Sequence, residues 1–131
     1  MIIDGNFCTV SPGIELHYAK CGDPDAPLLL LLHGFPEYWF AWAHVMPVFA
    51  NRWQVMAPDL RGYNRSSRPV EPARYKASEL IGDLVSLIEQ FGGGKAYLVA
   101  HDWGGALAWG LACARPDLLH KLVILNAPHP V

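Results

Sequence analysis

The chain has 131 residues, of which 52% are hydrophobic and 17% are charged, and its formal net charge is −2 at pH 7. This length fits one domain or part of one, and the high apolar content with low charge excludes a disordered chain. Ten Lys and Arg stand against twelve Asp and Glu. This balance gives no electrostatic reason to expect binding to nucleic acid or to an anionic membrane.

The three cysteines, Cys8, Cys21 and Cys113, are widely spaced and form no metal-binding motif. We interpret them as the reduced thiols of a cytoplasmic protein, and we expect no metal and no cofactor. The first residues, 1–5, lack the basic segment of a secretory signal, and the longest apolar run, 28–32, is too short to span a bilayer.

The first half of the chain is predicted to form a β-hairpin followed by alternating strand and helix. Residues 7–10 and 14–19 alternate loosely around a Ser-Pro-Gly turn, which indicates the hairpin. Residues 28–32 are five consecutive leucines, and a strand that is apolar on both faces is typically covered by helices on both sides. A helix rich in Trp and Ala is predicted over 38–50, and a short strand over 53–57.

The second half continues this alternation. After a long polar connection, the apolar residues of 77–92 recur at the spacing of one helical face, and a glycine ends this helix. A buried strand over 95–100, a helix over 104–115 and a strand over 122–125 follow. We therefore predict an α/β fold with a mostly parallel sheet, an N-terminal hairpin and helices on both faces.

In such a sheet, chemistry is expected beyond the carboxyl ends of the strands. Residues 100–105 join a strand to a helix with the spacing small–x–nucleophile–x–small, which is typical of a nucleophile elbow, and Asp102 takes the central place. The N-terminus of the following helix favours the ionised carboxylate, which can attack carbon to form an alkyl–enzyme ester. This chemistry suits an epoxide or a carbon–halogen bond.

The alternative is that Asp102 only caps the following helix. Gly104 and Gly105 favour the elbow, because paired glycines weaken the start of a helix unless close approach requires them. A second loop, after the leucine strand, can aim the N–H of Phe35 at the same point as the N–H of Trp103, which makes an oxyanion hole. We interpret His33 as a buried residue that fixes this loop.

Four segments in this order resemble the α/β-hydrolase superfamily, and within it the epoxide hydrolases, with haloalkane and haloacetate dehalogenases nearby. The segments are HGFPEYW (33–39), DLRGY (59–63), HDWGG (101–105) and LNAP (125–128). The resemblance implies that Asp102 is the nucleophile, that Phe35 and Trp103 supply the oxyanion-hole N–H groups, and that Pro36 follows a cis peptide bond. We also expect Pro36 and Trp39 to line the substrate pocket.

Two positions separate the epoxide hydrolases from the dehalogenases. Haloalkane dehalogenases usually carry Asn where this chain has Phe35, and haloacetate dehalogenases tend to carry Arg where it has Trp103. Both departures favour an epoxide hydrolase that uses no cofactor and acts on a small-molecule epoxide. A haloalkane or haloacetate dehalogenase acting on a halide substrate remains the alternative.

In the resembling families, the acid and the catalytic histidine come late in the chain, and a cap domain follows the sixth strand. We therefore expect residues 1–131 to be the N-terminal part of a single core domain, truncated after about six strands and lacking the cap and the C-terminal strands. His129 is a weak candidate for the base. Because residues 122–125 would form an open sheet edge, we predict a homo-oligomer or a complementary C-terminal segment. A catalytically inactive product that self-associates is a further alternative.

Other patterns carry less weight. The glycines before Lys95 do not fit a phosphate-binding loop and indicate a turn. Among the arginines of 61–74, we expect one to pair with Asp59 in a solvated loop. We interpret the remaining histidines, His17 among them, as incidental because they lack metal-ligand spacing.

Overall fold

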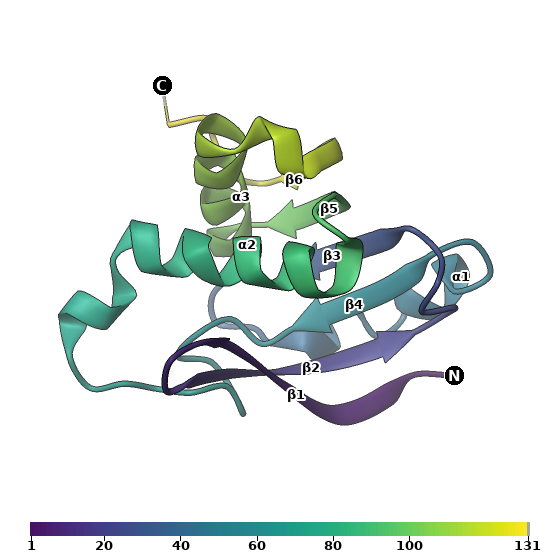
Figure 1. Cartoon of the computed structure of the whole chain (residues 1–131), viewed down its shortest axis with the longest axis horizontal. Coiled ribbons are helices and arrows are strands. Elements are labelled where there is room, and N and C mark those ends of the chain that lie inside the picture. The colour runs from purple at the N-terminus through teal and green to yellow at the C-terminus, as the bar shows by residue number, and fades with distance from the viewer. Residues whose placement is uncertain (131) are drawn as a thin grey trace.

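The computed structural model describes residues 1–130, and its centre is one six-stranded sheet (Figure 1). The strands are β1 (Ile3–Ser11), β2 (Ile14–Cys21), β3 (Leu28–Leu32), β4 (Gln54–Pro58), β5 (Ala96–His101) and β6 (Leu119–Leu125). They lie in the order β1-β2-β4-β3-β5-β6. The hairpin β1–β2 is antiparallel and β2 pairs antiparallel with β4, whereas β4, β3, β5 and β6 run parallel. The predicted α/β fold with an N-terminal hairpin is confirmed.

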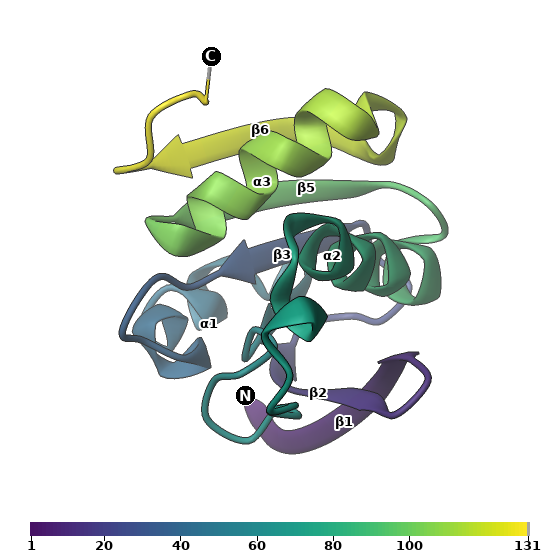
Figure 2. The same ribbon diagram turned by 90° about the vertical axis from the view of Figure 1, so that its left-hand side faces the viewer.

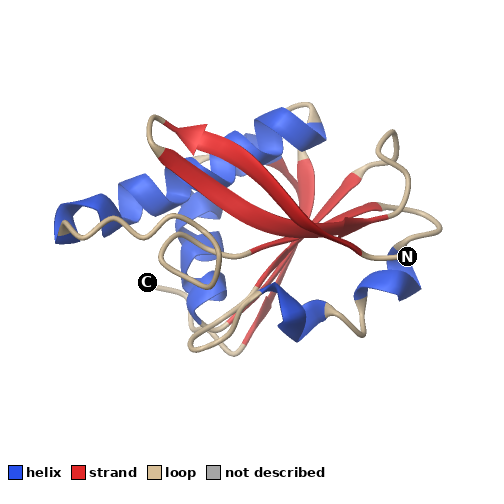
Figure 3. Cartoon of the chain, turned by 90° about the horizontal axis from the view of Figure 1, so that it is seen from below, coloured by secondary structure: helices blue, strands red, loops and turns tan. Residues whose placement is uncertain are grey.

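Helices cover both faces of the sheet (Figure 3). On one face lie the long helices α2 (Ala77–Gly92) and α3 (Trp103–Ala114), and on the other lie η1 (Trp39–Trp42) and α1 (Met46–Phe49). Two further short helices, η2 (Pro72–Tyr75) and η3 (Pro116–Leu118), lie in the connections. Over residues 1–130, no helix combines the length and apolar character needed to cross a membrane.

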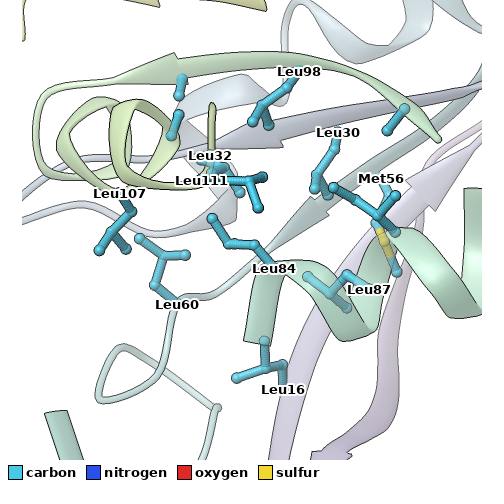
Figure 4. Close-up of a cluster of buried hydrophobic side chains, with 14 of the residues drawn as sticks. Leu16, Leu30, Leu32, Met56, Leu60, Leu84, Leu87, Leu98, Leu107 and Leu111 are labelled. Carbon is cyan, nitrogen blue, oxygen red and sulfur yellow. The ribbon is translucent and has the colours of Figure 1, made fainter. Parts of the chain in front are cut away.

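The leucine run of β3 explains this two-sided cover. Successive side chains of a strand point to opposite faces. Leu28, Leu30 and Leu32 accordingly pack against α2 and α3 in the larger hydrophobic cluster, whereas Leu29 and Leu31 pack against η1 and α1. Figure 4 shows Leu30 and Leu32 within the larger cluster. All five side chains are buried, as a central strand between two layers requires.

The predicted helix over 38–50 is wrong in its continuity, because the chain forms two short helices there instead. Pro47 has no N–H to donate to a carbonyl one turn earlier, and its ring favours the first turn of a helix over its interior. It lies in the first turn of α1, and η1 ends at Trp42. The helix over 77–92 is confirmed, and it stops where Gly93 adopts a left-handed backbone with φ +63°.

The last strand lies at the sheet edge opposite the hairpin (Figure 2). Within the described chain, β6 pairs only with β5. Its side chains Val123 and Leu125 are 48% and 42% exposed. An apolar hollow of about 290 Å³ beside them is lined by β3, β5, β6, η1 and α1.

Candidate active site

Asp102 occupies the tight turn between β5 and α3. Its backbone has φ +56° and ψ −119°, a conformation that a residue other than glycine rarely adopts. The backbone N–H of Asp102 donates to Leu125 O at 3.0 Å, and its carbonyl accepts from Ala106 N–H at 3.0 Å. The strained turn is therefore held by β6 on one side and by the first turn of α3 on the other.

Three glycines allow the chain to approach this turn closely. A Cβ on Gly34 would lie 2.8 Å from Asp102 Oδ2 and closer still to Asp102 Cβ. A Cβ on Gly104 would lie 2.9 Å from Leu32 Cβ, and one on Gly105 would lie 2.7 Å from Ala127 Cβ. The small residues around Asp102 are therefore required by packing, which is the reason the sequence analysis gave for them.

The loop after β3 contacts the Asp102 carboxylate directly. Phe35 N–H donates to Asp102 Oδ2 at 2.9 Å, and the peptide bond between Phe35 and Pro36 is cis, as predicted. The N–H groups of Phe35 and Trp103 lower the pKa of Asp102, and the nearby His101 adds to this effect. The Asp102 side chain makes no capping hydrogen bond to α3. These contacts favour an ionised carboxylate turned toward the loop over a simple helix cap.

Hydrogen bonds of the buried His33 ring fix the conformation of this loop. Its ring is fully buried, its Nε2 accepts from Leu60 N–H at 2.9 Å, and its Nδ1 lies 2.9 Å from Gly34 O. Because Nε2 accepts, Nδ1 carries the proton and donates to Gly34 O. Burial lowers the pKa of His33. These contacts support the interpretation of His33 as a residue that fixes the loop.

A hollow of about 400 Å³ is lined by Phe35 and Trp103, the two residues whose N–H groups act on the Asp102 carboxylate, whereas Asp102 itself is not among its lining residues. The side chains of Phe35 and Trp103 are 70% and 42% exposed. Tyr63 and Tyr75 lie among its other lining residues. Burial raises the pKa of Tyr63, and the charge of Asp102 adds to this effect. Neither Pro36 nor Trp39, which were expected to line the substrate pocket, is among the residues that line this hollow. Trp39 is only 8% exposed and packs in the cluster on the α1 face.

The predicted pairing of an arginine side chain with Asp59 is wrong. Arg61 turns toward α2 and forms a buried ion pair with Asp83, with Nη2 2.7 Å from Oδ1. Asp59 accepts instead from His17, from Asn64 and from the backbone N–H groups of Trp39 and Arg65. His17 is fully buried rather than incidental. Asp83 lies among the buried residues of α2, so a carboxylate within an apolar helix segment signals that it has a buried partner, but it does not say which residue that partner is.

The sequence analysis gave no role to Glu37 and His101, which form a second contact between loop and elbow. Glu37 Oε1 accepts from Gly34 N–H at 2.9 Å and lies 3.1 Å from His101 Nδ1. The ring of His129 packs against Trp109, with the ring centres 4.7 Å apart. Within residues 1–130, no cluster of three or more His, Cys, Asp or Glu side chains is suited to hold a metal ion.

Comparison with known proteins identifies the class to which this fold and elbow belong. Residues 27–131 match the family described as the alpha/beta hydrolase fold. The chain therefore belongs to the α/β-hydrolase family.

Two curated relatives match nearly the whole chain. It is 48% identical over 131 residues to an AB hydrolase superfamily protein of Bacillus subtilis, covering 98% of this chain and 46% of the relative. It is 41% identical over 129 residues to epoxide hydrolase 4 of mouse, covering 96% of this chain and 36% of the relative. The chain thus spans less than half the length of these curated relatives.

A solved structure supports the fold independently. A mutant of an epoxide hydrolase from Bacillus megaterium, in complex with its product, a naphthyloxy-propane-diol, superimposes with a TM-score of 0.90 at 38% identity. The match covers 95% of this chain and 43% of that one. The described residues therefore have the fold of the corresponding part of an epoxide hydrolase.

Proposed function

We propose that this chain carries the nucleophile of an epoxide hydrolase and that Asp102 is that nucleophile. The supporting observation is the Asp102 carboxylate itself. It lies on a strained turn between strand and helix, it is partly exposed, and backbone N–H groups lower its pKa. An ionised, oriented carboxylate that contacts residues lining an aromatic hollow is suited to attack a strained carbon–oxygen bond.

We assign the attack to Asp102 Oδ1, because Oδ2 already accepts from Phe35 N–H. A bond forms between Oδ1 and one epoxide carbon, and the bond between that carbon and the epoxide oxygen breaks. The electron pair stays on the epoxide oxygen, which takes a proton from solvent water to become a hydroxyl group. The product of this step is an ester between Asp102 and the substrate.

The second step is hydrolysis of that ester by water. Water adds to the ester carbonyl carbon, negative charge develops on the former Oδ2, and cleavage of the carbonyl–oxygen bond releases a diol and restores Asp102. The N–H of Phe35, which already faces Oδ2, and the N–H of Trp103 stabilise this oxyanion. Activation of the water needs a base.

We propose that the isolated chain stalls at the ester. His101 lies against Glu37, and the ring of His129 packs on Trp109. We assign neither histidine to the role of base. In this proposal the chain reacts once with an epoxide and then turns over slowly.

We propose an epoxide with an aromatic substituent as the substrate. The hollow of about 400 Å³ is lined by Phe35, Tyr63, Tyr75 and Trp103, whose rings can pack against a flat apolar group. The Bacillus megaterium relative, whose product carries a naphthyl group, supports the same class.

We also propose that the β6 edge is covered, either by a second copy or by a complementary segment of chain. Within residues 1–130, β6 has one strand neighbour, and exposed Val123 lines the apolar hollow beside it. An open apolar edge tends to pair with another strand.

We also propose a cytoplasmic location for the protein, because all three cysteines are free thiols.

Intact-mass measurement after incubation with styrene oxide tests the proposed chemistry. Because Cys113 is an exposed thiol that an epoxide can alkylate, the experiment uses a Cys113→Ser background. We expect one added mass of styrene oxide, which Asp102→Asn abolishes. A chain that does not react, or that reacts equally with and without Asp102, contradicts the proposal. Halide release from a chloroalkane, with no reaction toward styrene oxide, identifies a dehalogenase instead.

A further inference from the structure

One carboxylate oxygen links the loop after β3 to the end of β5. Glu37 Oε1 accepts from Gly34 N–H at 2.9 Å and lies 3.1 Å from His101 Nδ1. His101 directly precedes Asp102 in the chain. The side chain of Glu37 therefore connects the segment that bears the Phe35 donor with the segment that bears the carboxylate.

The backbone of Glu37 acts on the next peptide group, the one that joins Gly34 to Phe35. Glu37 N–H donates to Gly34 O at 2.8 Å, and His33 Nδ1 lies 2.9 Å from that same oxygen. The Gly34 carbonyl and the Phe35 N–H belong to one planar peptide group, in which they point in opposite directions. Any group that fixes the Gly34 carbonyl therefore also fixes the direction of the Phe35 N–H toward Asp102.

We propose that Glu37 and His101 form a positioning pair that holds the Phe35 N–H on Asp102 Oδ2. This inference rests on the proposed function, because it assigns the pair to the same carboxylate. The pair does not contact the substrate in this account. It borders a separate hollow of about 180 Å³, which shares no lining residue with the aromatic hollow lined by Phe35 and Trp103.

We expect Glu37 and His101 to act on Asp102 by fixing the geometry of the loop rather than by their charges. The side chains of His101 and Glu37 are 35% and 34% exposed, so water screens their mutual attraction. The titratable groups that bear on Asp102 are His101 from β5 and Tyr63 from the loop after β4. A change at Glu37 therefore reaches Asp102 chiefly through the loop that it holds.

The sign of one measurement separates the two mechanisms. If Glu37 acted only by its negative charge, its removal would lower the pKa of Asp102, because like charges raise the pKa of a carboxyl. If Glu37 acts by positioning, its removal weakens the Phe35 hydrogen bond, and the pKa of Asp102 rises toward its ordinary value. Glu37→Gln retains an oxygen that can accept from Gly34 N–H while removing the charge.

The test is a carbon-13 NMR titration of the Asp102 carboxyl in the present chain, assigned with Asp102→Asn and combined with amide hydrogen exchange at Phe35. We expect Glu37→Ala to raise the pKa of Asp102 and to speed Phe35 exchange, and Glu37→Gln to restore most of both. Glu89→Ala, which removes an exposed carboxylate of α2, is the matched control and changes neither.

His101→Gln provides an independent variant, because it leaves the bond between Glu37 and Gly34 available while removing the imidazole. The charge of His101 itself lowers the pKa of Asp102, so its loss raises that pKa under either mechanism. Hydrogen exchange at Phe35 is therefore the readout for this variant, and we expect it to speed up, though less than with Glu37→Ala. A folded Glu37→Ala chain with an unchanged or lowered pKa of Asp102 and unchanged Phe35 exchange overturns the proposal, and so does unchanged Phe35 exchange in a folded His101→Gln chain. The titration needs no epoxide, so a chain that forms no adduct refutes the proposed function without deciding the positioning role.

Discussion

Replacement of Gly34 with alanine tests whether the close contact between loop and elbow is needed for reactivity. The added Cβ would lie 2.8 Å from Asp102 Oδ2 and 3.0 Å from Asp102 Cγ. Uncrowded heavy atoms lie about 3.5 Å apart, so the loop must retreat by roughly 0.5–1 Å. Rotation of the Asp102 side chain does not relieve the clash, because the added carbon is closest to Asp102 Cβ, which the backbone of the turn fixes.

Two effects follow from this displacement. Overpacking of this kind destabilises a protein by about 1–3 kcal/mol, which lowers the Tm of a domain of this size by roughly 3–12 °C. A misplacement of about 1 Å lowers a reaction rate by roughly 100-fold. We therefore expect Gly34→Ala to remain folded at 25 °C and to form the styrene oxide ester about 100-fold more slowly than the Cys113→Ser parent.

Gly82→Ala is the matched control for this experiment. Gly82 is an exposed position inside α2, and an added Cβ there meets nothing within 4 Å. The alanine should raise the stability by about 1 kcal/mol, because glycine is the poorer helix former, and should leave the rate of ester formation unchanged. If Gly34→Ala reacts as fast as Gly82→Ala, the contact is not part of the reactive geometry and the reasoning is refuted.

Three further predictions concern stability and the sheet edge. Asp83→Ala should lower the free energy of urea unfolding by about 3–5 kcal/mol, because it leaves the Arg61 guanidinium buried without its partner, and Arg61→Met with Asp83→Leu should recover much of that loss. Burial lowers the pKa of His33 below its ordinary value of 6.5. His33 therefore takes up a proton more readily in the unfolded chain than in the folded chain. The free energy of unfolding should therefore fall as the pH drops below about 6.5, and a fall between pH 7.5 and 5.5 that is no smaller in His33→Gln would contradict this assignment. Hydrogen exchange at Val123 and Ile124 should be slow in an associated chain, whereas fast exchange in a stable monomer would count against pairing at β6.

Features of the fold that depend on local sequence pattern were predictable. The leucines of β3 indicated a strand covered on both faces, and their side chains do alternate between the two hydrophobic clusters. The apolar spacing over 77–92 predicted α2, because its buried side chains are those of one helical face. The elbow was predictable because small residues at fixed offsets indicate a close approach, which Gly104 and Gly105 make in the structure.

Features that depend on which side chains meet across the fold were not predictable in the same way. Arg61 and Asp83 lie 22 positions apart, and no local pattern says that Arg61 turns to α2 rather than to Asp59. The same limit applies to Glu37 and His101, which are 64 positions apart. The burial of Trp39 follows from the packing of η1 on the sheet, whereas its place in the sequence suggested the pocket.

The central claim is that the Asp102 carboxylate attacks an epoxide carbon. The most direct measurement is to locate the modified residue by tandem mass spectrometry of peptides from the Cys113→Ser chain after reaction with styrene oxide. The account predicts one ester, on Asp102, that mild base removes. Modification confined to other carboxylates or to histidines, with Asp102 intact, would contradict the account.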